Sequence, residues 1–159
     1  LRPESRSGAA YDVQALAKLC DRVVLTAGDI WTGRNFESCL ERLVQLMPVG
    51  RVLAGVKAQA ILRRGASETA LDAAAAHNLA LSTRSRIYRE QSFAPAEFDY
   101  RDAAGQVCHV SYTDALWFHG LFDRLHSFGF AGLSCAGIDS LAPCGKVIFD
   151  AKFSPENLG

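Results

Sequence analysis

The sequence has no excess of charge of either sign. Its 17 basic and 17 acidic residues cancel over 159 positions. Binding to nucleic acid or to an anionic membrane surface draws on a basic field, which this composition does not supply. We therefore expect neither nucleic acid nor membrane among the partners. Hydrophobic residues make up 49% of the chain and charged residues 21%, which is typical of a globular protein.

Long apolar runs are also missing. A helix that spans a bilayer needs roughly 20 apolar residues, and the longest apolar stretches here are far shorter. Residues 1–7 are mostly polar and lack the apolar segment of a signal peptide. We expect a soluble chain that is part of a longer protein.

Motifs that would hold a metal or a cofactor are absent from the sequence. The cysteines form no CxxC pair, and the four histidines do not cluster at zinc spacing. There is no P-loop, dinucleotide fingerprint or Ser-His-Asp signature either. We expect no metal and no cofactor. The odd number of cysteines argues against a disulfide scaffold and favours buried, inert thiols at Cys20, Cys39, Cys108, Cys135 and Cys144.

The first third of the chain predicts a parallel βαβ unit. Residues 23–27 are a continuous apolar run, typical of a buried parallel strand, and residues 51–56 have the same character. Between them, residues 35–47 carry apolar side chains at helical spacing. Asn35 is available to cap this helix, and Pro48 follows to end it.

The middle of the chain, residues 67–112, predicts a small α+β insertion. Residues 67–77 have high helix propensity. Residues 97–101 and 107–112 alternate between apolar and polar side chains, and an Asp-Ala-Ala-Gly turn separates them. These two runs predict an antiparallel hairpin, in which Gly105 supplies a positive φ.

The last third predicts one more helix and one more strand. Thr113 and Asp114 open a segment with apolar residues on one helical face, and Gly129 follows it as a stop signal. Residues 130–136 then form a strand rich in small side chains, which suit a crowded barrel interior.

In this order the elements resemble the last part of a glycoside hydrolase family 18 barrel. Residues 98–115 are similar to a segment of the family's bacterial envelope and spore-coat branch, which has an aromatic strand, an Asp-Ala-x-Gly turn and a strand with a histidine. Residues 128–132 resemble the Tyr-Gly-Leu-x-Gly segment that follows in that branch. The resemblance implies an α/β fold with the last three strands of a (β/α)8 TIM-type barrel. Residues 1–159 would form this single partial barrel domain, with residues 67–112 as its insertion.

The resemblance also implies a substrate class but no catalysis by this chain. Members act on β-linked N-acetylglucosamine polymers, chitin or peptidoglycan, which places the chain at the cell envelope or outside the cell. Family 18 catalysis rests on an Asp-x-x-Asp-x-Asp-x-Glu motif. The partial match, Asp99-x-x-Asp102, carries Ala104 and Gln106 at the last two positions and falls in the predicted hairpin. We expect no catalytic residue and no hydrolysis by this chain.

Three residues are predicted to bind substrate. Asp29 matches the Asp of the family's Met-x-Tyr-Asp motif, although Gly28 replaces the Tyr. Gln59 takes the place of an aromatic residue, and Ala136 that of the Trp beneath the sugar site. Trp31 could partly replace this lost aromatic surface. The simpler alternatives are a local turn role for Asp29 and a packing role for Trp31.

Other polar residues have simpler interpretations. His119, Asp123 and His126 share one helical face, where a metal site and a solvated polar surface are both open. His109 lies in an alternating strand, where we expect a surface role or a hairpin-stabilising role rather than catalysis.

The alternative function is that of a noncatalytic interaction or scaffolding domain in a larger envelope polysaccharide-processing protein. Its partner would be the N-terminal part of the barrel, or a second copy that pairs through open sheet edges. A self-sufficient small α/β domain is the third hypothesis.

Overall fold

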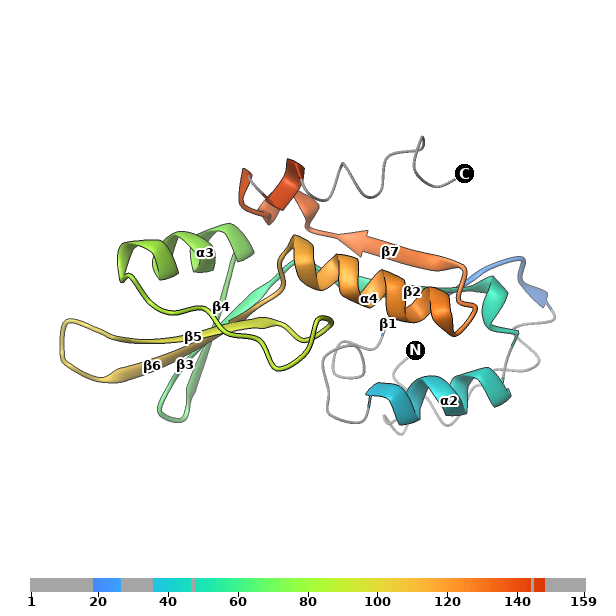
Figure 1. Cartoon of the computed structure of the whole chain (residues 1–159), viewed down its shortest axis with the longest axis horizontal. Coiled ribbons are helices and arrows are strands. Elements are labelled where there is room, and N and C mark those ends of the chain that lie inside the picture. The colour runs from blue at the N-terminus through green and yellow to red at the C-terminus, as the bar shows by residue number, and fades with distance from the viewer. Residues whose placement is uncertain (1–18, 27–35, 47, 144, 148–159) are drawn as a thin grey trace. The chain divides into compact units, whose positions relative to one another are not determined.

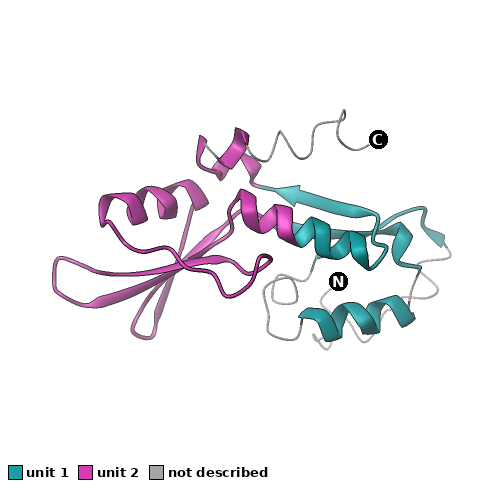
Figure 2. Ribbon diagram, viewed as in Figure 1, with its two compact units in different colours: residues 1–56, 121–136 teal, residues 57–120, 137–159 magenta. Residues whose placement is uncertain are grey.

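The structure is a computed structural model that describes residues 19–26, 36–46, 48–143 and 145–147. It divides into two compact units, which are coloured in Figure 2. The first unit comprises Leu1–Val56 and Leu121–Ala136, and the second comprises Lys57–Gly120 and Gly137–Gly159. None of the helices in the described ranges has both the length and the apolarity needed to cross a membrane.

The first unit contains a three-stranded sheet in the order β1-β2-β7 (Figure 1). Its strands are β1 (Val23–Thr26), β2 (Val52–Lys57) and β7 (Gly132–Ala136), and helix α2 (Phe36–Leu46) lies between β1 and β2 in the chain. Strands β1 and β2 pair in parallel, from Val23 opposite Val52 to Thr26 opposite Gly55. The predicted parallel βαβ unit is confirmed.

The apolar face of α2 explains why residues 36–46 form a helix here. Phe36, Leu40 and Leu43 are buried and follow each other at i, i+4 and i+7. Burying one such side chain contributes about 1.5–3 kcal/mol, which the helix gains only when it packs on other elements. Val44, predicted on the same face, is 42% exposed.

The second unit contains a four-stranded antiparallel sheet in the order β4-β3-β6-β5 (Figure 1). Its strands are β3 (Ala60–Arg64), β4 (Ser67–Leu71), β5 (Ala96–Arg101) and β6 (Val107–Tyr112). Helix α3 (Ala73–Ser82) packs on one face of this sheet through Ala76 and Ala80. The sheet contributes Ala60, Ala96, Phe98, Val110 and Tyr112 to the same core.

The helix predicted over residues 67–77 is wrong in its first half. Residues 67–71 form strand β4, which pairs with β3 from Arg64 opposite Ser67 to Ala60 opposite Leu71. A two-residue turn with Gly65 at φ 58° joins the two strands. Helix propensity is a weak local preference, and the ladder of hydrogen bonds to β3 overrides it. The helix begins at Ala73 instead.

The predicted hairpin is confirmed in its strands and in its turn. Strands β5 and β6 pair from Ala96 opposite Tyr112 to Arg101 opposite Val107. In the turn, Asp102 Oδ1 accepts the backbone N–H groups of Ala104 and Gln106, and Gly105 has a φ of 79°.

Helix α4 (Ala115–Ser127) runs from the second unit into the first. Gly129, at φ 80°, ends the helix as predicted. The N–H of Gly129 donates to the carbonyl of His126, and the N–H of Phe130 donates to the carbonyl of Leu125. Two short 3-10 helices, Val49–Arg51 and Ile138–Ser140, complete the described elements.

Candidate functional site

Thr113 fastens the start of α4 to the chain that leaves β2. It is 4% exposed, and its backbone N–H donates to the carbonyl of Gln59 at 3.0 Å. Its hydroxyl accepts the N–H of Gln59 at 2.9 Å and lies 3.3 Å from the carbonyl of Lys57. Two segments that are 54 residues apart in sequence are thereby held in register.

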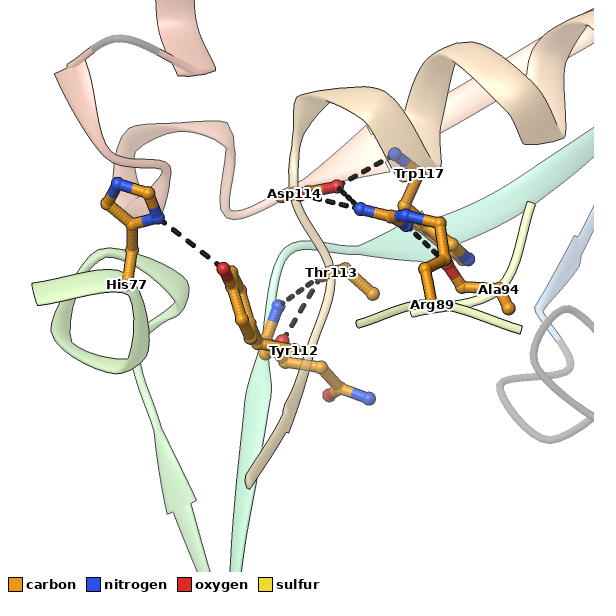
Figure 3. A network of polar contacts seen from close by, with 8 residues as sticks. His77, Arg89, Ala94, Tyr112, Thr113, Asp114 and Trp117 are labelled. Atoms are coloured by element: carbon orange, nitrogen blue, oxygen red, sulfur yellow. Dashed lines mark hydrogen bonds and ion pairs between the residues drawn. The ribbon is translucent and has the colours of Figure 1, made fainter. Parts of the chain in front are cut away.

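Asp114 is the next residue and caps α4. Its Oδ1 accepts the backbone N–H of Trp117 at 2.8 Å, which satisfies one of the free donors at the helix start. Arg89 Nη2 donates to both carboxylate oxygens, at 2.8 and 2.7 Å (Figure 3). Arg89 Nη1 also donates to the carbonyl of Ala94. The arginine therefore ties the loop between α3 and β5 to the helix start.

A cavity of about 150 Å³ lies beside this network, and we call it the His77 pocket. At its edge the Nδ1 of His77 lies 3.4 Å from the hydroxyl of Tyr112 (Figure 3). The pocket is lined by Ala73, His77, Tyr112, Thr113, Asp114, Ala115, Leu116, Leu141, Ala142 and Gly145, so most of its wall is apolar. The whole pocket belongs to the second unit.

The three residues predicted to bind substrate are not brought together in the described part of the chain. Asp29 and Trp31 lie outside the described residues, as does Gly28. Gln59 is exposed, and its backbone is bound to Thr113. The predicted site residues therefore stay predictions.

The partial acid motif lies in a hairpin, as predicted. Asp99 is the third residue from the end of β5, and Asp102 forms the turn. His109 Nδ1 lies 2.9 Å from Asp99 Oδ1, directly across the strand pair, so of the two predicted roles the contact favours the one in the hairpin. Arg63 faces His109 from the next strand and bonds to Glu68 at 2.7 Å, which completes a polar row across the sheet.

The described residues assemble no metal centre around the histidines of α4. Within the described ranges, no three His, Cys, Asp or Glu side chains come together as ligands. Asp123 and His126 are exposed and His119 is half-buried. The ring of His126 stacks on that of Phe122, with centroids 6.0 Å apart. This face of the helix therefore carries polar side chains at the surface.

The cysteines are free rather than bonded, wherever the structure describes them. Cys108 is buried, Cys39 and Cys135 are half-buried, and Cys20 is exposed. The prediction of buried thiols is therefore confirmed for Cys108 and wrong for Cys20. Burial raises the pKa of the Cys135 thiol to about 11, so this thiol is protonated at neutral pH.

Asp114 carries a local signal, because it stands three residues before Trp117 at the start of an apolar helix, and the sequence analysis placed it there. Arg89 and His77 escaped the sequence analysis. They carry no local signal, since they stand 25 and 35 residues from Asp114 and Tyr112, their respective partners. The antiparallel sheet brings them to these partners, because its strands β4 and β5, on either side of α3 in the chain, belong to the same sheet as β6.

Comparison with known proteins rests on structure. No protein-family model matches the sequence, and no curated protein sequence matches it either. The spore cortex-lytic enzyme SleL from Bacillus cereus superposes with a TM-score of 0.76 over 91% of this chain, at 20% identity. A chitinase from Chromobacterium violaceum superposes with 0.78 over 96%, at 16% identity. A class V chitinase from Nicotiana tobaccum superposes with 0.73 over 91%, at 11% identity.

The chain shares its fold with these enzymes. The resemblance predicted from the sequence is confirmed at the level of the fold. The chain spans 37% of the cortex-lytic enzyme, 51% of the first chitinase and 52% of the second. Its α/β arrangement corresponds to part of their structure, and the described residues contain no closed barrel.

Proposed function

We propose that this chain belongs to a carbohydrate-active protein of the family 18 type that binds β-linked N-acetylglucosamine polymers, chitin or peptidoglycan. One observation carries the proposal. A cortex-lytic enzyme and a chitinase both match more than nine-tenths of the chain, with TM-scores of 0.76 and 0.78. One of these proteins is named for lysis of the spore cortex and the other for chitin, so the cell envelope or the outside of the cell is the proposed location.

In this proposal the chain binds glycan and does not hydrolyse it unaided. The printed sequence lacks the complete acidic motif, and Asp102, its nearest match, has both carboxylate oxygens engaged: one by the hairpin turn and one by Arg64 at 3.2 Å. A carboxylate held in this way is not available to protonate a glycosidic oxygen. Hydrolysis would need an acid from outside these 159 residues.

The proposed contacts are those of Asp29, Trp31 and Gln59. Asp29 would accept a hydroxyl or amide proton of the sugar, and Trp31 would pack on the apolar face of a pyranose ring. The Gln59 side chain is exposed while its backbone is fixed by Thr113, so its amide is free to reach a ligand. In the same proposal, residues 1–159 form one partial barrel domain, and residues 67–112 are its insertion.

Tryptophan fluorescence tests the proposal. Trp117 is 2% exposed and packs edge-on against Phe118, with ring centroids 4.8 Å apart, so its emission should change little on binding. Titration of the chain with chitooligosaccharides should give a saturable change that is lost in Trp31→Phe and kept in Trp117→Phe. Asp29→Ala should abolish binding without unfolding the chain.

The opposite result favours the interaction domain. If millimolar chitooligosaccharide produces no saturable response in the folded chain, glycan binding is wrong. The chain would then be expected to associate with the rest of a barrel or with a second copy, which sedimentation analysis detects.

A further inference from the structure

The antiparallel unit carries a second cleft, where the segment that follows α3 meets the end of strand β5. We call it the Arg84 cleft, and its volume is about 680 Å³. It is lined by Thr83, Arg84, Ser85, Asp99, Tyr100, Arg101 and Val107. We propose that the Arg84 cleft binds a carboxylate group of an anionic glycan. This inference rests on the proposed function for its substrate class and names the charged group that is recognised.

The backbone of Arg84 has a conformation that favours glycine. Among the described residues other than glycine, Arg84 alone has a positive φ, of 51°. Gly129 takes the corresponding place after α4, at φ 80°. A Cβ is disfavoured in this region, so an arginine at this position costs the fold stability. Residues held in such conformations cluster at ligand-binding sites, which makes Arg84 a candidate for function.

The guanidinium groups of this cleft have unused hydrogen-bond donors. The Arg84 side chain makes no hydrogen bond or ion pair within the part of the chain that the structure describes. Arg101 donates from Nη1 to the carbonyl of Gly105 at 2.9 Å, and a guanidinium carries five N–H donors. Both arginines are exposed. Two such groups favour a carboxylate, which accepts charge-assisted hydrogen bonds from them.

The acidic residue of the lining does not compensate this charge. With two arginines and one aspartate, the lining has an excess of one positive charge. The carboxylate of Asp99 has partners of its own, because its Oδ1 lies 2.9 Å from Nδ1 of His109 and its Oδ2 accepts the hydroxyl of Tyr88 at 3.4 Å. The cleft therefore attracts an anion rather than a cation.

The backbone that carries Arg84 is fixed in the absence of a ligand. The hydroxyl of Ser85 donates to the carbonyl of Asp99 at 3.0 Å, which joins the segment after α3 to strand β5. The hydroxyl of Thr83 donates to the carbonyl of Leu79 at 2.7 Å, which holds the same segment to the end of the helix. Binding therefore has to order the two arginine side chains but not the chain that carries them.

Charge distinguishes the two polymers of the proposed function. Chitin is neutral, because its N-acetylglucosamine units carry no ionised group. Peptidoglycan carries carboxylates, either on the lactyl group of muramic acid or on the peptide attached to it. A volume of about 680 Å³ lies within the range of small-molecule sites and has room for a sugar with an acidic substituent. The Arg84 cleft therefore favours peptidoglycan over chitin.

Titration with N-acetylmuramic acid tests the proposal. We expect saturable shifts of the backbone amide NMR signals of Arg84, Ser85 and Arg101. The methyl ester of this sugar is neutral and should bind at least tenfold more weakly, because it loses the charge-assisted bonds. Muramyl dipeptide carries its carboxylate on the peptide instead, so the tighter of the two acids identifies the source of the charge. If neither acid shifts these signals, or if the ester binds as tightly as the acid, the proposal is wrong.

Substitution of Arg84 separates recognition from folding. Arg84→Gly removes the guanidinium and the unfavourable conformation together. It should weaken binding of N-acetylmuramic acid about three- to tenfold, while the melting temperature stays equal or rises. Arg101→Gln should weaken binding by a similar factor. Arg86→Gln changes an exposed arginine outside the lining and should bind like the unmodified chain. Unchanged binding in both cleft variants would overturn the proposal.

A neutral ligand distinguishes failure of this proposal from failure of the proposed function. If chitotriose with all three acetyl groups binds, but N-acetylmuramic acid leaves the signals of Arg84, Ser85 and Arg101 unchanged, the cleft proposal fails and the proposed function stands. If N-acetylmuramic acid binds at the cleft, but neither chitotriose nor a peptidoglycan tetrasaccharide binds to the chain, the proposed function fails and the carboxylate site stands.

Discussion

Arg89 and Asp114 form a two-pronged ion pair, in which one guanidinium nitrogen lies 2.8 and 2.7 Å from the two carboxylate oxygens. The same carboxylate caps α4 at Trp117. The side chains are 18% and 26% exposed, so solvent screens this pair less than a pair at the surface. One acidic residue thus joins a helix start to a loop 25 residues away.

Replacement of Asp114 should destabilise the fold measurably. Asp114→Ala removes the cap and leaves Arg89 without its ion-pair partner, so we expect the free energy of unfolding to fall by about 2–4 kcal/mol. Asp114→Asn keeps an oxygen for the cap and should cost about half as much. Urea denaturation measures both. Glu68→Ala, which breaks the exposed pair with Arg63, is the control and should cost less than about 0.5 kcal/mol.

Gly120 lies inside α4, where alanine would ordinarily favour the helix by about 1 kcal/mol. A Cβ at this position would lie 2.5 Å from the carbonyl oxygen of Ser92 and 2.8 Å from its carbon. These are backbone atoms, which cannot rotate away. We therefore expect Gly120→Ala to lower the free energy of unfolding by about 1–2 kcal/mol despite the gain in helix propensity.

Gly145→Ala is the matched control for Gly120→Ala, because its nearest neighbour would lie at 3.7 Å. Thermal unfolding of both variants checks the prediction. Equal melting temperatures for Gly120→Ala and the unmodified chain would show that the backbone at Ser92 leaves room for a Cβ at position 120, and would contradict the prediction.

Arg84 ends α3 in the way that Gly129 ends α4. The N–H of Arg84 donates to the carbonyl of Leu81, and the N–H of Ser85 donates to the carbonyl of Ala80. The φ of Arg84 is 51°. A left-handed conformation costs a residue with a Cβ about 1–2 kcal/mol, and glycine is free of this cost. Arg84→Gly should therefore raise the free energy of unfolding by up to about 1 kcal/mol, once the greater freedom of glycine in the unfolded chain is deducted.

Arg86→Gly is the control for that stabilisation, since Arg86 has no positive φ. It should leave stability unchanged or lower it. A loss of stability in Arg84→Gly comparable to that in Arg86→Gly would contradict the prediction.

The pKa of Cys135, raised to about 11 by burial, predicts that stability depends on pH in the alkaline range. The folded state holds its proton more tightly than the unfolded state, whose thiol has an ordinary pKa of 9.0. The protonated Cys135 thiol therefore contributes fully to the stability of the fold below pH 9, and this contribution is lost as the pH rises from 9 to 11. Cys135→Ser should flatten that part of the stability curve.

Thiol labelling checks the same group directly. At pH 8 the exposed Cys20 should react with a disulfide reagent much faster than Cys135, because only the thiolate attacks. Mass spectrometry of the labelled peptides identifies each site. Equal rates at Cys20 and Cys135 would overturn the assignment.

The elements that local pattern could predict are those with a strong period or a clear stop signal. The parallel pairing of β1 and β2 followed from two continuous apolar runs, and the face of α2 followed from its helical spacing. Gly105 and Gly129 marked a turn and a helix end, because positive φ favours glycine strongly enough to be read locally. The order of these elements was enough to indicate the fold that the chitinase and the cortex-lytic enzyme share.

Long-range pairing decided the rest. The sequence by itself determined the α/β character, the hairpin of β5 and β6, and the absence of a complete acidic motif. Only the tertiary structure turned residues 67–71 into a strand, because hydrogen bonds to β3 outweigh the helix preference of that segment. It alone placed Arg89 on Asp114 and His77 on Tyr112, since contacts between residues so far apart in the chain leave no periodic signal in the sequence.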